Sequence, residues 1–255
     1  MRDSRERFTD RVDDYVRYRP GYPQDALDWI VRGCGLGPGK VVADLGSGTG
    51  ILSRLLLASG ARVLGVEPNA AMRAAAERQL GGEERFQSVD GSAEATGLGP
   101  SSVDAATAGQ AFHWFDAHRA RTELARILRR GGRVALAWNM RSSTPFNDDY
   151  EAMLVNFAPE YPASRALDRA AEPAVRAFFW PAEARVGRFP SGQQLDEAGL
   201  RGRLLSSSYA PKPGAPEHAP MMRRLAEIFA AHARDGHVEL AYETVVFLGQ
   251  LEATT

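Results

Sequence analysis

Cysteine and lysine are scarce in this chain of 255 residues, which has one cysteine, Cys34, and two lysines, Lys40 and Lys212. A single thiol excludes an internal disulfide and a cysteine-based metal cluster, and its place before a glycine-rich turn favours a structural role. No stretch is apolar for long enough to span a bilayer, and the first residues have no apolar run typical of a secretory signal. We therefore expect a cytoplasmic protein without a metal site and without membrane contact.

An excess of charge of one sign is also absent, because 31 basic and 32 acidic residues leave a net charge of −1. Arginine supplies nearly all of the positive charge, but the acids balance it, so we predict no nucleic-acid partner. A hydrophobic content of 44% and a charged content of 25% are typical of a globular protein. The length suits one large domain or a core with a cap, while a monomer and a homodimer both remain open.

Strands and helices alternate regularly in the first half of the chain. Apolar runs typical of buried strands lie near 40–45, 61–67, 84–89, 103–108 and 133–138, with helical segments between them. This alternation predicts an α/β fold of the Rossmann-like type, with a doubly wound parallel sheet.

The regions before and after this alternation have a different pattern. Two short helices, split by a proline–glycine turn at 19–23, come first, and beyond residue 140 we expect mixed helices, strands at 184–189 and 238–248 and a loop-rich region at 191–216. We therefore predict a helical lid over 1–36, a nucleotide-binding core over 37–145, and a C-terminal part over 146–255. This last part would complete the sheet and carry inserted helices that cap the substrate.

The most informative motif is the segment 41–50, where an apolar run is followed by Asp44 and alternating glycines. It predicts a strand, a tight turn and a helix start, where glycine lets the backbone approach a ligand closely. Asp44 would repel the pyrophosphate of a dinucleotide and attract an ammonium group. S-adenosylmethionine (SAM) carries an ammonium and a carboxylate but no phosphate. The loop therefore predicts a SAM site that includes Asp44, Gly46, Ser47, Gly48 and Gly50.

Further positions follow the next strands at the same edge of the sheet. Glu67 ends the second strand, where an acid can accept both ribose hydroxyls of SAM or equally of NAD. The turn at 92–94 can place a backbone amide on the adenine ring. The remaining predicted cofactor contacts are Arg19, Pro68, Met72, Ser92, Ala93, Glu94, Gln110 and Ala111.

A crevice beyond the carboxyl ends of the strands would hold the second substrate. His113 could remove a proton from an acceptor or only form a local hydrogen bond, and Arg141 could pair with a carboxylate or simply lie on the surface. Arg19 could instead meet the carboxylate of the methionine part of SAM. The predicted substrate contacts are Tyr18, Tyr22, His113, Trp114, Trp138, Asn139 and Arg141, with His113 as the candidate catalytic base.

These motifs resemble the class I SAM-dependent methyltransferase superfamily. The match covers the loop at 44–50, Glu67, the turn at 92–94 and the turn at 128–132, although Ser92 and Arg130 stand where the superfamily often has Asp and Pro. Segments 15–23, 110–116 and 138–141 are similar to a narrower group around trans-aconitate methyltransferase. That resemblance implies a seven-stranded sheet with an antiparallel last strand, and small-molecule methylation of organic acids or natural-product intermediates in secondary metabolism.

The expected reaction is one SN2 step that passes the sulfonium methyl to the acceptor and leaves S-adenosylhomocysteine. A carboxylate acceptor would need no base and could be held by Arg141 or Arg19, whereas a phenol, amine or carbon acceptor would need His113. An NAD-dependent oxidoreductase is an alternative, although Asp44 and the glycine spacing disfavour it. A SAM-binding regulator without transfer activity is a second alternative.

Overall fold

The computed structural model of the protein describes residues 12–251, except for the side chains of 164 and 167–171. Its centre is one seven-stranded sheet in the order β3-β2-β1-β4-β5-β7-β6, in which β7 runs antiparallel to both neighbours. The predicted Rossmann-like sheet with an antiparallel last strand is therefore confirmed. The strands are β1 (Val41–Leu45), β2 (Arg62–Val66), β3 (Phe86–Val89), β4 (Val103–Gly109), β5 (Leu128–Arg141), β6 (Arg185–Leu195) and β7 (Val238–Gly249).

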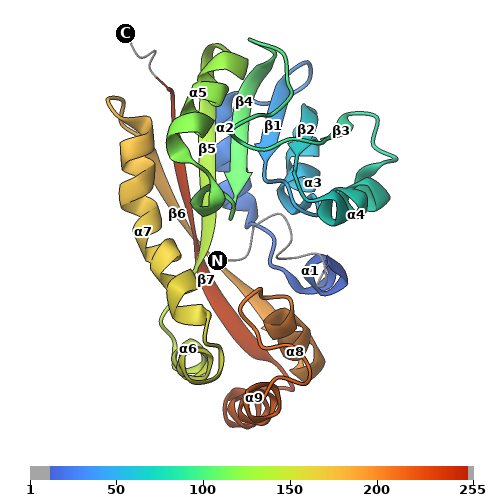
Figure 1. Ribbon diagram of the computed structural model, residues 1–255, viewed down its shortest axis with the longest axis vertical. Helices are drawn as coiled ribbons and strands as arrows, with labels where there is room; N and C mark the ends of the chain where they lie inside the picture. Colours follow the sequence, from blue (N-terminus) through green and yellow to red (C-terminus); the bar gives the residue numbers. More distant parts are fainter. Residues whose placement is uncertain (1–11, 252–255) are drawn as a thin grey trace.

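Helices cover both faces of this sheet (Figure 1). Short polar side chains begin several of them: Asn69 and Asp116 each accept two backbone N–H groups of the helix that follows. The helical elements are α1 (Val12–Tyr18), α2 (Gln24–Cys34), α3 (Ile51–Leu57), α4 (Ala70–Leu80), η2 (Phe112–Trp114), α5 (Ala117–Ile127), α6 (Pro145–Phe157), α7 (Tyr161–Phe179), α8 (Glu197–Leu205) and α9 (His218–His232). No helix in the described part of the chain is both long and apolar enough to cross a membrane.

The core has two apolar layers, one on each face of the sheet. Val42 packs with residues of α2 and α3, whereas its neighbours Ala43 and Leu45 pack with residues of α5 and α7 on the opposite face. Each large aliphatic side chain buried in this way contributes about 1.5–3 kcal/mol to stability. Cys34 belongs to the first layer, and burial raises the pKa of its thiol to about 12, so it has the structural role that we predicted.

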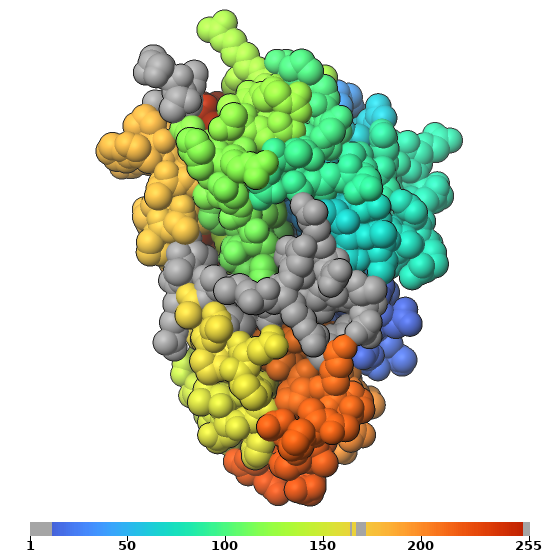
Figure 2. All heavy atoms as spheres, in the orientation of Figure 1, coloured from blue at the N-terminus to red at the C-terminus, as the bar shows by residue number. Residues whose placement is uncertain are grey.

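The C-terminal part forms a second lobe around a long hairpin. β6 pairs with β7 over its whole length, but β5 pairs only with residues 242–249 of β7, so the start of β7 at 238–241 projects beyond β5. A separate apolar cluster that includes Tyr150, Leu204 and Met221 joins this projection to α6, α8 and α9. Figures 1 and 2 show this lobe, yellow to orange, below the core along the long axis of the molecule.

Three local predictions need correction. The expected loop-rich region at 191–216 contains the end of β6 and all of α8, whose first turn is capped by Asp196. The expected turn at 130–132 lies within the irregular start of β5, where Gly131 has a φ of 79°. In the predicted lid, α2 belongs to the core, since its apolar face packs on β5, β6 and β7. Residues 1–11 of that lid lie outside the described residues.

Candidate functional site: two adjoining cavities at the sheet edge

The glycine loop between β1 and α3 is fixed to the end of β2. The N–H groups of Gly46 and Ser47 donate to the Val66 carbonyl at 2.8 and 3.2 Å, and Gly46 and Gly48 have φ values of 61° and 57°. A Cβ atom on Gly46 would lie 2.7 Å from the Ala111 Cβ. Glycine is therefore needed for backbone shape and close packing. These N–H groups bind the protein itself, unlike the ligand-binding amides that we expected.

Asp44 lies at the base of this loop and is 1% exposed. Its carboxylate accepts hydrogen bonds from the Ser53 hydroxyl at 2.6 Å and the Thr107 hydroxyl at 3.0 Å. Burial raises the pKa of Asp44 to about 6, although both hydroxyl groups act in the opposite direction. The Asp44 carboxylate is thus ionised at neutral pH, and its two hydrogen bonds hold it in a fixed position from which it attracts a cation.

Glu67 follows β2 and is buried beside the loop. Its two oxygens accept the backbone N–H groups of Gly48 at 3.0 Å and Asn69 at 2.8 Å. Burial raises its pKa, while these two hydrogen bonds lower it. Each oxygen keeps a lone pair, so the fixed carboxylate can accept two neighbouring hydroxyl groups, as a ribose would present them.

The larger cavity, of 620 Å³, opens between this acid and the ends of β3 and β4. Its volume falls within the range of small-ligand and cofactor sites. The predicted cofactor residues that line it are Gly46, Gly48, Glu67, Pro68, Met72, Ser92, Ala93, Glu94, Gln110 and Ala111. Gly50 does not line this cavity, because at the start of α3 it packs against the Leu80 side chain. Tyr15, Phe115 and Arg119 also line the cavity, and sequence reasoning missed them because their segments meet it only in the folded chain.

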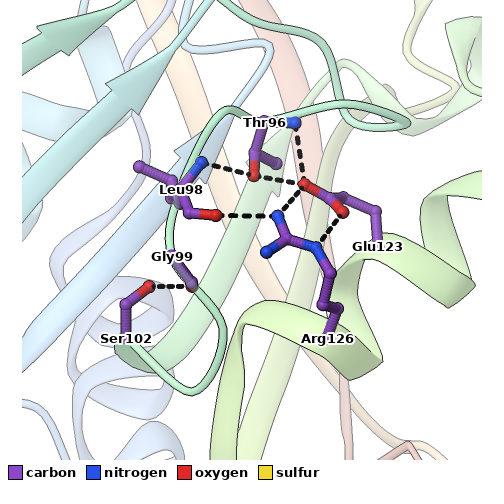
Figure 3. Close-up of polar contacts among 6 residues, drawn as sticks. All are labelled: Thr96, Leu98, Gly99, Ser102, Glu123 and Arg126. Carbon is purple, nitrogen blue, oxygen red and sulfur yellow. Dashed lines mark hydrogen bonds and ion pairs between the residues drawn. The ribbon is translucent and has the colours of Figure 1, made fainter.

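The loop after β3, which carries the turn at 92–94, is held by a polar network shown in Figure 3. Glu123 on α5 accepts the N–H and the hydroxyl of Thr96, and it forms a two-pronged ion pair with Arg126. Arg126 also donates to the Leu98 carbonyl at 2.7 Å. Hydrogen bonding to Arg126 holds the pKa of Glu123 at about 2, against the effect of burial. The network fixes one wall of the cavity from outside.

Gln110 stands between the larger cavity and a second one. It has a φ of 56°, a left-handed conformation that is uncommon for a residue with a side chain. Its backbone N–H donates to the Ala137 carbonyl and its side-chain amide to the Asn139 carbonyl. Such strain persists only where the surrounding structure imposes it and is frequent at ligand sites.

The second cavity, of 140 Å³, reaches the C-terminal lobe, and the residues that it shares with the first are Tyr15, Gly46, Gly48, Gly109, Gln110 and Trp114. Asp44 and Ser47 line its core side, together with the predicted substrate residues Tyr22, His113, Trp114, Asn139 and Arg141. Asn139 joins three elements, since it donates to the Gly21 carbonyl and accepts from the Thr244 hydroxyl. Among the side chains that the structure describes, no group of three or more histidine, cysteine, aspartate or glutamate residues could hold a metal ion.

Two predicted substrate residues lie elsewhere. Trp138 is 1% exposed, and its ring packs edge-on against Phe112 and Phe247 within the core. Because side chains alternate along a strand, Asn139 faces the cavity and Trp138 faces away from it. Tyr18 packs against Gly202 of α8 and lines a separate groove. Neither residue lines either of the two cavities.

Arginine and tyrosine dominate the lobe side of the second cavity. Arg141 donates to the Tyr161 hydroxyl at 2.5 Å and to the Tyr209 hydroxyl at 3.4 Å, and its Nε has no hydrogen-bond partner among the described residues. Arg203, which is 4% exposed, donates to the hydroxyls of Tyr242 and Ser207. Neither guanidinium belongs to any ion pair identified in the described part of the chain.

Arg19 completes this cationic wall from the loop after α1. It lies over the Tyr15 ring and donates to the Ser206 carbonyl at 3.0 Å, and burial and Arg203 both lower its pKa. Its Nε likewise has no hydrogen-bond partner within the described residues. Sequence reasoning named Arg19 and Arg141 but missed Arg203 and Tyr209, which come from the region that it assigned to loops.

Known proteins with similar sequences and structures are methyltransferases. Residues 43–136 match the model of a methyltransferase domain family. The chain is 40% identical to an uncharacterized methyltransferase of Mycobacterium tuberculosis over 140 residues, which are 55% of each protein. It is 27% identical to an uncharacterized methyltransferase-like protein of Schizosaccharomyces pombe over 253 residues, 96% of this chain and 95% of that protein. A proposed type II methyltransferase from Anaeromyxobacter dehalogenans aligns with a TM-score of 0.64 at 22% identity, over 92% of this chain and 98% of that one.

The matched segment contains the glycine loop, Glu67 and most of the larger cavity. The alignment with the mycobacterial protein spans about half the length of that protein, and the solved structure shows that the fold is shared. The domain match supports a methyltransferase domain over residues 43–136. The lobe that supplies Arg203 and Tyr209 lies outside residues 43–136, and the relatives that also align with it are named only as methyltransferases or methyltransferase-like.

Proposed function

We propose that the protein transfers the methyl group of SAM to a small organic acid. The observation that carries this proposal is the pair of guanidiniums, Arg141 and Arg203, which face a cavity next to the cofactor site without any carboxylate identified as a partner. Removing a cation from water is costly unless an anion or hydrogen bonds compensate for it. An acidic acceptor would supply that compensation.

The cofactor would bridge the two cavities. Glu67 would accept the ribose hydroxyls, and the turn at 92–94 would contact the adenine. The methionine part would extend past Gly46 toward Asp44, which attracts its ammonium group. Arg19 would then pair with the methionine carboxylate, which leaves Arg141 and Arg203 for the acceptor.

The expected chemistry is a single displacement. A carboxylate oxygen of the acceptor would attack the methyl carbon, the bond from carbon to sulfur would break, and its electron pair would stay on sulfur. The protein would contribute by positioning the two groups in line and by excluding water. His113 lines the same cavity and is the proposed base for an acceptor with a hydroxyl or amine, and a His113→Gln variant with an unchanged pH profile would argue against that role.

A screen of acceptors tests this proposal. The protein is incubated with SAM and a panel of small carboxylic acids, each matched with its primary amide, and methyl gain is followed by mass spectrometry. We expect products among the acids and none among the amides. Methylation of amides or of other neutral compounds alone would contradict the proposal. SAM binding without any transfer across the panel would favour the regulator that the sequence left open.

A further inference from the structure

Tyr209 is the group that the proposed reaction leaves without a role. It follows α8 in the segment 206–209, and its hydroxyl lies 3.4 Å from Nη1 of Arg141. Its ring packs edge-on against Tyr161 at a centroid distance of 5.0 Å. A second guanidinium, Arg203, also acts on this hydroxyl from α8. The phenol therefore occupies the place where the anionic group of an acceptor would meet both arginines.

The charged and titratable neighbours of Tyr209 come from several elements. Burial alone would raise the pKa of Tyr209, but Arg141 and Arg203 lower it to about 8. Arg19 acts in the same direction from the loop after α1, and the phenols of Tyr150, Tyr161 and Tyr242 surround the cluster. Burial raises the pKa of Tyr150, and it raises that of Tyr161 to about 12, so these two phenols stay neutral when Tyr209 ionises.

We propose that Tyr209 is the internal counter-anion of Arg141 and Arg203, and that it competes with an acidic acceptor for these two guanidiniums. This inference rests on the proposed function. Above about pH 8, when the cavity holds no acceptor, the phenolate of Tyr209 compensates the two cations. When an acid binds, two anions share the same pair of arginines, so Tyr209 takes up one proton from solvent and becomes a neutral phenol. Tyr209 thereby acts as a positioning residue for the arginine pair and limits acceptor binding at high pH.

The direction of the pH effect follows from this competition. Below about pH 8, Tyr209 is neutral and an acid binds without proton uptake. Above that pH, each unit lowers the affinity for the acid by about tenfold, because one more proton must be bound together with the ligand. By reciprocity, a bound acid raises the pKa of Tyr209.

The experiment follows tyrosinate formation by ultraviolet absorbance over a pH titration, with and without succinate as the probe acid. It uses the wild-type protein, Tyr209→Phe and the matched control Tyr161→Phe, and the SAM affinity of each variant checks that it is folded. We expect one phenol to ionise near pH 8 in the wild type and in Tyr161→Phe, and no such step in Tyr209→Phe. Succinate should move the step upward by about one pH unit or more. Its affinity should fall above pH 8 in the wild type but stay flat in Tyr209→Phe.

The possible failures are distinguishable. Absence of a step near pH 8 in the wild type overturns the inference, whether or not succinate binds. A step that succinate leaves in place, although it binds, overturns the inference but leaves the acidic acceptor standing. If the step is present and succinate does not bind at any pH, both the inference and its basis in an acid-binding arginine pair fail.

Discussion

The two cavities share a wall but are built in different ways. The larger one is formed mainly by the turns that follow β1, β2, β3 and β4, with Glu67 as its fixed acid. The smaller one is formed by long side chains from the first loop, β5, α7, α8 and β7, which are separated by up to some 220 residues in the chain. The lining of the larger cavity, the proposed cofactor side, thus depends on a local motif, whereas that of the smaller cavity, the proposed acceptor side, depends on how the C-terminal lobe packs.

Their charges also differ in a way that suits methyl transfer. Asp44 and Glu67 lie beside the glycine loop, where a cationic cofactor would bind, whereas Arg141 and Arg203 line the smaller cavity from β5 and α8. A sulfonium and a carboxylate neutralise each other as the methyl group moves, and a site that excludes water favours this loss of charge. The acids and the arginines can be substituted separately, so the role of each charge can be tested independently.

The largest expected effect is on the acceptor side. Arg141→Met removes a charged donor from the arginine pair, so kcat/KM for the acid found in the screen should fall about ten- to hundredfold, since a hydrogen bond to a charged group contributes about 1.5–3 kcal/mol. The matched control is Arg165→Met, because Arg165 lines the same cavity but is paired with Glu151 at 3.0 Å. Calorimetry should show that Arg141→Met changes the SAM affinity less than threefold. Equal losses in both variants would indicate general damage to the lobe.

On the cofactor side, Glu67→Gln should weaken SAM binding by about tenfold or more. The amide can still accept one of the two backbone N–H groups, but it leaves the other without an acceptor and offers one fewer oxygen to the ribose. The control is Glu77→Gln, an exposed acid on α4. Unchanged SAM affinity in Glu67→Gln would rule out the ribose role of this acid.

A smaller effect concerns the pH dependence of SAM binding. The pKa of Asp44 is raised to about 6, so its carboxylate is lost as the pH falls through that value. SAM affinity should decrease below pH 6, by up to about tenfold per unit, and Asp44→Asn should be weaker at neutral pH but free of this dependence. A wild-type affinity that stays constant from pH 7 to pH 5 would contradict the role of Asp44.

The smallest effect is expected from the network outside the cofactor cavity. Glu123→Gln removes the ion pair with Arg126, and a loss of about 1 kcal/mol would lower Tm by about 2–4 °C in a protein of this size. The pKa of Glu123 is lowered to about 2, so its stabilising effect is complete above the unfolded value near 4 and is lost as the pH falls toward 2. Thermal unfolding at pH 7 and pH 3 should therefore differ less in Glu123→Gln than in the wild type.

The core and the cofactor side were largely predictable from sequence because their signals are local. The strand pattern located five parallel strands, and the segment 41–50 located the turn beside the larger cavity. The acceptor side was only partly predictable. Arg141 was predicted because it ends a strand next to the crevice. Arg203 was missed because it lies on α8, in a segment whose glycines and serines favoured a loop. Trp138 was wrongly predicted to line the substrate pocket. Successive side chains of a strand point to opposite faces of the sheet, and no motif indicated which face Trp138 occupies.

Calorimetric titration of the wild-type protein with SAM, and separately with NADH, tests the cofactor assignment most directly. The two adjoining cavities predict saturable binding of SAM with one site per chain, and no binding of NADH under the same conditions, because Asp44 lies where a pyrophosphate would have to approach the loop. Saturable binding of NADH without binding of SAM would contradict a methyltransferase and favour an oxidoreductase.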